Sequence, residues 1–97
     1  MKTEQELKIM AETMAETITI RTMENGNSHD TTRTSTDGEK NILKNILSGA
    51  LLTINFGTDY AGKKQAILDM AEFTTMQFLP NANCYDSVYC KLQLAII

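Results

Sequence analysis

Residues 38–56 read GEKNILKNILSGALLTINF, and this stretch decides the fold. Its apolar side chains recur at steps of three and four, the period of a single helix face. They are Ile42, Leu43, Ile46, Leu47, Ala50, Leu51 and Ile54. Thr36 and Glu39 have capping-box spacing ahead of the stretch, and Gly57 is well placed to end it. The pattern predicts an amphipathic helix with one face in a core.

A second helix is predicted directly after the first, over 59–79. Thr58 or Asp59 can cap its start, and Pro80 ends it because proline cannot continue a helix. Only a few residues separate 38–56 from 59–79, so we expect an antiparallel helical hairpin. At 100° per residue, one face of the second helix carries Tyr60, Ile67, Ala71, Thr74 and Phe78.

The N-terminal segment, 3–23, is predicted to be a third helix. Thr3 and Glu6 have capping-box spacing, and an apolar stripe follows. The stripe consists of Leu7, Met10, Met14 and Ile18. The end of this segment stays open, because residues 17–22 alternate and are rich in β-branched side chains, which favours a strand.

Residues 24–41 contain no large apolar side chain, so they have nothing to bury. We expect a polar, solvated loop at about 24–37. The alternative is a β-hairpin that turns near Asn25 and Gly26, with 31–36 pairing back onto 17–22.

The C-terminal segment, 85–97, fits two periods. Val88, Cys90, Leu92, Leu94 and Ile96 share one parity, as in a strand, whereas Tyr85, Val88, Tyr89, Leu92, Ala95 and Ile96 make a helical stripe. We favour a helix, and a strand if 17–36 forms a hairpin. The fold expected is a single mainly α domain over 1–97. The alternative is α+β, with a small antiparallel sheet of 17–23, 30–36 and 87–96.

Composition limits the classes of function. The chain has 97 residues, 42% of them hydrophobic, and a net charge of −3, which fits one domain and argues against nucleic-acid binding through a basic surface. Residues 1–6 are too polar for a signal peptide, and no apolar run is long enough to span a membrane, so we expect a cytoplasmic protein. Cys84 and Cys90 are too far apart in a helix or a strand to join, so two reduced thiols are expected.

The sequence shows no catalytic or metal-binding motif. His29 is the single histidine and sits in the polar stretch, and its spacing to the two cysteines is not that of a zinc site. Phosphate-binding glycine loops and nucleophile elbows are also missing from the sequence. We therefore expect no enzyme activity, no cofactor and no metal.

Four lysines give an alternative function. Lys40, Lys44, Lys63 and Lys64 flank the helical hairpin and could hold an anion. An antiparallel hairpin separates the two pairs by roughly 25–30 Å at 1.5 Å per residue, so only oligomerisation could unite them. The corresponding function is an oligomeric protein that sequesters a small anionic ligand such as a nucleotide.

Apolar side chains outside the main stripes give the preferred function. One helical pair cannot bury both sides of both helices, and exposed apolar patches usually mark interfaces. The candidate partner-binding residues are Leu52, Phe56, Phe73, Met76 and Tyr89. We expect a small non-enzymatic interaction protein that forms homo-oligomers or binds and modulates a larger protein complex, such as a phage-type accessory inhibitor. Nucleic acid and membrane are not expected as partners.

Overall fold

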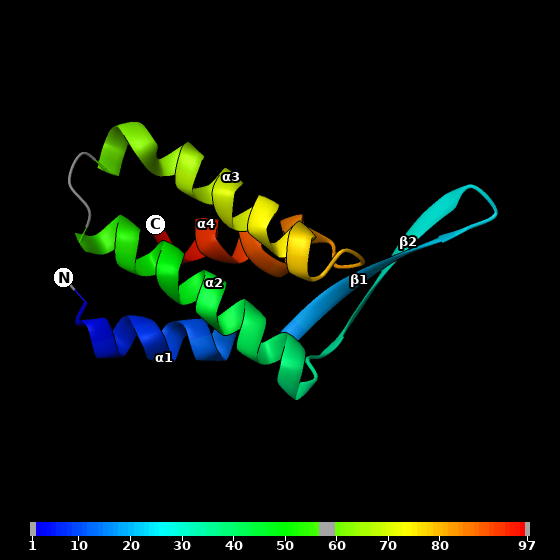
Figure 1. Ribbon diagram of the computed structural model, residues 1–97, viewed down its shortest axis with the longest axis horizontal. Helices are drawn as coiled ribbons and strands as arrows, with labels where there is room; N and C mark the ends of the chain where they lie inside the picture. Colours follow the sequence, from blue (N-terminus) through cyan, green and yellow to red (C-terminus); the bar gives the residue numbers. More distant parts are fainter. Residues whose placement is uncertain (1, 57–59, 97) are drawn as a thin grey trace.

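The computed structural model describes residues 2–56 and 60–96, and it shows a mostly helical chain with one antiparallel β-hairpin. The elements follow in the order α1 (Glu4–Met14), β1 (Thr17–Glu24), β2 (Asn27–Thr34), α2 (Asp37–Phe56), α3 (Tyr60–Phe78), the π-helical segment η1 (Tyr85–Tyr89) and α4 (Cys90–Ile96). The helices form one body, and the hairpin projects from it along the longest axis of the molecule (Figure 1). The fold is therefore α+β in content, with the core supplied mainly by the helices and by Ile18 at the base of β1.

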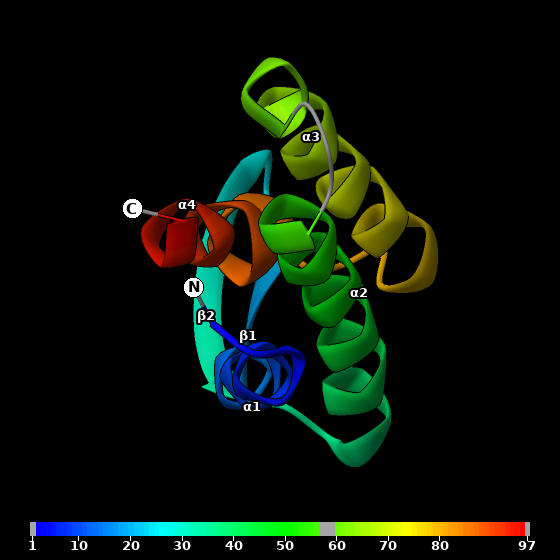
Figure 2. The ribbon, with the colours of Figure 1, turned by 90° about the vertical axis from the view of Figure 1, so that its left-hand side faces the viewer.

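The core lies where the helices meet. Seen nearly end-on, α1, α2 and α3 form a curved row, and α4 fills its concave side (Figure 2). The largest side chains of this core are almost fully buried: Leu7, Ile18, Leu43, Leu47, Leu51, Leu68, Val88 and Leu92. Each contributes about 1.5–3 kcal/mol through removal of apolar surface from water. Burial in this core holds the helices together.

The predicted helical hairpin is confirmed as α2 and α3. The apolar stripe of α2 faces the core, and the capping box at its start is formed, with Thr36 N donating to Glu39 Oε1 at 2.9 Å and Glu39 N to Thr36 Oγ1 at 3.3 Å. The predicted stop at Gly57 and the predicted caps at Thr58 and Asp59 lie outside the described residues.

The predicted core face of α3 is rotated relative to the observed one. Leu68, Ala71 and Thr75 are buried, whereas Phe78 is 62% exposed. The reason is that α3 contacts η1 as well as α2. These contacts turn the buried face of α3 toward the C-terminal segment. The prediction for Phe78 was wrong because it considered packing of the two hairpin helices alone.

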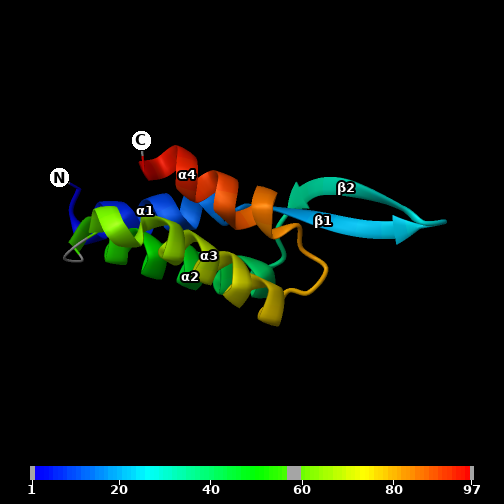
Figure 3. The ribbon, with the colours of Figure 1, turned by 90° about the horizontal axis from the view of Figure 1, so that it is seen from above.

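The predicted loop at about 24–37 is wrong, and the alternative of a β-hairpin is confirmed, with its second strand at Asn27–Thr34 in place of 31–36. β1 and β2 pair without a bulge from Thr17↔Thr34 to Glu24↔Asn27. Asn25 and Gly26 have φ of 52° and 81°, the left-handed pair that a two-residue turn requires. The N-terminal helix accordingly ends at Met14 instead of continuing to residue 23. Figure 3 shows that the hairpin extends well beyond the helices.

The C-terminal segment is helical, so the expectation of a strand beside a hairpin is wrong. The outer edge of β1 is bonded by residues just before η1: Arg21 N donates to Asn81 O at 2.8 Å, and Asn83 N donates to Thr19 O at 2.7 Å. These two hydrogen bonds pair backbone groups on the outer edge of β1 near its base. Val88 and Leu92 are then buried by a helix against the other helices.

The described helices include none that is long and apolar enough to cross a bilayer.

Candidate interaction surface

An open apolar groove of about 530 Å³ runs between α2 and α3. Ile46 and Ala50 form its α2 wall, and Ile67, Met70 and Ala71 form its α3 wall. The groove exists because small side chains stand where large ones would fill the space between the helices. Gly49 belongs to this set, since a Cβ built on it would have no atom within 4 Å. The surface is thus hollow and mostly apolar.

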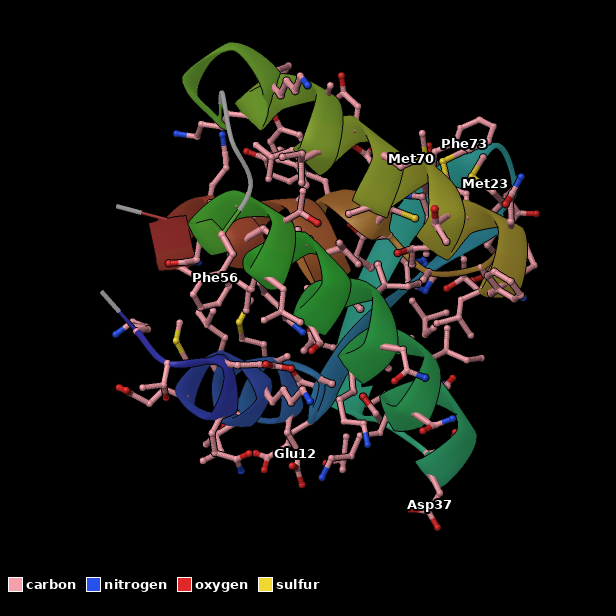
Figure 4. All side chains as sticks on the ribbon, turned by 60° about the vertical axis from the view of Figure 1, so that its left-hand side comes forward. Glu12, Met23, Asp37, Phe56, Met70 and Phe73 are labelled. Carbon is pink, nitrogen blue, oxygen red and sulfur yellow. The ribbon has the colours of Figure 1, made fainter. Side chains whose placement is uncertain are left out.

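Two large apolar side chains of α3 are exposed here: Met70, which lines the groove, and Phe73, which follows it about one helical turn later. Met70 is 65% exposed and Phe73 is 57% exposed, and both project outward from α3 (Figure 4). Burial of such a side chain is worth about 1.5–3 kcal/mol, so leaving two neighbours in water gives up a substantial stabilisation. We call the groove together with Met70 and Phe73 the α2–α3 surface. Its apolar groove and its exposed apolar side chains make it the candidate docking site.

The five candidate partner-binding residues separate into two groups. Phe56, Phe73 and Met76 are exposed. Leu52 is half-buried and packs against the core. Tyr89 is half-buried as well: its ring stacks on Tyr85 with 5.4 Å between centroids, and its hydroxyl exchanges hydrogen bonds with Gln65. Leu52 and Tyr89 therefore have partners within the chain.

Met70 was missed by the sequence reasoning. A signal was available, because Ala66, Met70 and Phe73 follow one another at steps of four and three and so share a helix face. The sequence did not identify this face as exposed, because Tyr60, Ile67 and Phe78 were expected to mark the core side of α3. Once the observed burial of Leu68 and Thr75 fixes the rotation of the helix, the face with Met70 points to solvent.

The four candidate anion-binding lysines do not meet within one chain. Lys40 and Lys44 lie in the first half of α2, and Lys63 and Lys64 lie near the start of α3. Because α2 and α3 run in opposite directions, these two pairs are at opposite ends of the hairpin (Figure 1). Lys63 alone lines the α2–α3 groove. A single anion site built from all four is not present in the described chain.

A polar cluster fastens the β-hairpin to the helices. Arg21 Nε lies 3.1 Å from Asp30 Oδ1, and Asn83 Nδ2 donates to Asp30 Oδ2 at 2.8 Å and to Asp86 Oδ2 at 3.1 Å. The hydrogen bonds from Arg21 and Asn83 lower the pKa of Asp30. These side chains bond one another, so we assign the cluster a structural role.

The histidine and the two thiols show no hydrogen bond to one another among the described residues. His29 is exposed on β2, with Nε2 3.4 Å from Thr22 Oγ1. Both thiols are free, and burial raises the pKa of Cys84, which makes this thiol a poor nucleophile. No cluster of His, Cys, Asp or Glu within 2–56 and 60–96 has the arrangement of a metal site.

The chain matches no known protein-family model, no curated protein and no solved structure.

Proposed function

We propose that this protein is a small, non-enzymatic, cytosolic interaction module that docks on a protein partner through the α2–α3 surface. The observation that supports this proposal is the combination of an apolar groove with the adjacent exposed side chains of Met70 and Phe73. Exposed apolar grooves and clustered exposed apolar side chains are typical of binding sites.

The mode of action we propose is steric. An aromatic or methionine side chain at the edge of a groove is a suitable anchor, because it removes much apolar area from water and adapts to the partner's shape. Phe73 and Met70 are such anchors, and the polar side chains of Asn45, Thr53 and Lys63 at the groove would set specificity. The protein covers a surface of a larger complex and so modulates that complex without catalysing a reaction.

The test compares wild-type protein with Phe73→Asp and Met23→Asp after purification under native conditions. Met23 is a matched control, since it is 68% exposed but lies on the hairpin, away from the groove. Light scattering should show wild type and Met23→Asp in assemblies larger than one 10.8 kDa chain, and Phe73→Asp as a single chain. Far-UV circular dichroism should be unchanged. Loss of helix in Phe73→Asp, or equal behaviour of both variants, would refute the proposal.

A further inference from the structure

The free end of the β-hairpin is closed by an asparagine that precedes a glycine. Asn25 and Gly26 are the two turn residues, with φ of 52° and 81°, and both are exposed. This end of the hairpin lies well away from the helices (Figure 3). A Cβ built on Gly26 would have no atom within 4 Å, and the Gly26 N–H has no backbone acceptor among the described residues. The peptide bond between the two residues is therefore open to solvent.

An asparagine followed by glycine can react within the chain. Gly26 N loses its proton to hydroxide and attacks Asn25 Cγ, a Cγ–N bond forms, and the side-chain amide nitrogen leaves as ammonia. The product is a five-membered succinimide ring. Water then opens the ring at one of its two carbonyls, which gives aspartate or isoaspartate and requires no oxidant or reductant. Glycine promotes the attack, because it has no Cβ to hinder the approach of its nitrogen.

We propose that Asn25 is a site of this spontaneous modification in the folded protein, with water as the only co-reactant. The attack requires the turn to open, because the ring imposes a backbone conformation different from that of a two-residue turn. The last hydrogen bonds from the hairpin to the rest of the chain are made by Arg21 and Asp30, each four residues from the turn. The end beyond them can open locally while the helical core stays folded.

The fold separates this site from a second reactive pair. Asn25 is the one asparagine followed by glycine, whereas Asp37 and Gly38 could form the same ring from a carboxylate. Asp37 and Gly38 lie in the first turn of α2, inside the capping box in which Thr36 and Glu39 bond each other. This box holds the backbone on both sides of the pair, and a carboxylate is a poorer electrophile than an amide at neutral pH. Asn25 should therefore react first.

The two products should affect the hairpin differently. Aspartate keeps the length of the main chain, and aspartate followed by glycine suits the same turn. Isoaspartate adds one carbon atom to the main chain between residues 25 and 26, so the turn no longer fits the pairing of Glu24 with Asn27. The strands near the turn should then separate. The base of the hairpin should persist, because residues of the helical body bond both backbone groups of Thr19.

The test follows the purified full chain during incubation at physiological temperature, with peptide mass spectrometry after digestion. The peptide with residue 25 should gain the mass difference between an amide and a carboxyl group, and the converted chain should carry one more negative charge than the −3 of the unmodified chain. Conversion should be faster at alkaline pH, because the attack needs the deprotonated amide. Asn27 is a matched internal control, since it is exposed on the same hairpin and is followed by serine. Gly26→Ala should slow the reaction severalfold, because its methyl group hinders the attack even though the strained turn opens more often.

A second measurement tests the effect on the hairpin. Nuclear Overhauser contacts between Hα atoms report two facing pairs, Met23↔Ser28 near the turn and Thr19↔Thr32 near the base. The isoaspartate form should lose the first contact and keep the second. Freshly prepared Asn25→Asp has the same charge and an unaltered main chain, so it should keep both contacts.

Three results of the mass measurement would overturn the modification site. They are an unmodified residue 25 after prolonged incubation, an earlier conversion of Asn27, and a Gly26→Ala variant that reacts as fast as wild type. An isoaspartate form that keeps the Met23–Ser28 contact would overturn the effect on the hairpin. None of these outcomes bears on the α2–α3 surface, so this proposal and the proposed function stand or fall separately.

Discussion

Replacement of Glu39 by glutamine tests the junction between the hairpin and α2. The Glu39 carboxylate accepts from Arg33 Nη1 at 2.7 Å and Nη2 at 2.8 Å, and from Thr36 N at 2.9 Å. The paired guanidinium is the largest cause that lowers the pKa of Glu39 from 4.5 to about 2. Glutamine keeps the shape of the side chain and removes its charge. It also replaces one carboxylate oxygen by an NH2 group that faces an N–H donor, so the substitution removes the ion pair together with one of its hydrogen bonds.

The magnitude follows from the pKa and the solvent exposure. A fall from 4.5 to about 2 corresponds to at most about 3.4 kcal/mol at 1.36 kcal/mol per pKa unit. The Arg33 side chain is 44% exposed, so solvent screens the pair, and we expect a contribution of about 1–2 kcal/mol. Since the pKa is lowered by folding, this stability is present above pH 4.5 and is lost as the pH falls toward about 2.

The assay is urea unfolding of wild type and Glu39→Gln at several pH values. At neutral pH the variant should be less stable by about 1–2 kcal/mol, and near pH 2 the difference should shrink toward zero. Glu12→Gln is the control, because Glu12 is exposed on α1 and its side chain has no hydrogen-bond partner among the described residues (Figure 4). The reasoning would be refuted if wild type and Glu39→Gln differed in stability by the same amount at neutral pH and near pH 2, or did not differ at either pH.

Three further predictions concern other long-range contacts and the turn. Ser87→Ala should lower thermal stability by about 1–3 kcal/mol, because the buried Thr19 N–H loses its acceptor at 2.9 Å; an unchanged melting temperature would contradict this. Lys91→Met should cost about 2 kcal/mol in urea unfolding, since the amine donates to Met14 O at 2.7 Å and to Thr17 O at 2.6 Å; a neutral result would show that water replaces these bonds. Gly26→Ala should speed amide exchange in the hairpin and leave α2 unchanged, because a φ of 81° costs an L-residue about 1 kcal/mol; equal protection in both proteins would argue against the turn geometry.

The candidate surface was only partly predictable from the sequence. Phe56, Phe73 and Met76 were found because their positions lie off the predicted core stripes, and they are exposed. Leu52 satisfied the same criterion and is half-buried, because other helices cover that side of α2. Met70 was missed, because the spacing of Ala66, Met70 and Phe73 shows that they share a helix face but not whether another element covers that face.

The parts of this fold that need no distant partner are determined by interactions between residues close together in the sequence. The period of the apolar residues in 38–56 and the capping residues Thr3 and Thr36 specify helices, because the helical hydrogen bonds and both capping boxes close within a few residues of chain. The sequence also placed a turn at Asn25 and Gly26 as one of two alternatives.

The secondary structure of two segments and the rotation of one helix depend on contacts with distant parts of the chain. Residues 27–34 are a strand only because β1 provides a partner, and they have no buried face of their own to reveal it. Residues 85–96 are helical because residues 81–83 already bond the edge of β1, so Val88 and Leu92 gain more by packing among helices. The rotation of α3, and with it the exposure of Met70 and Phe73, is set by the contact with η1. Hydrophobicity identifies side chains that can be buried, but which of them are buried is determined by the neighbours that the folded chain brings to them.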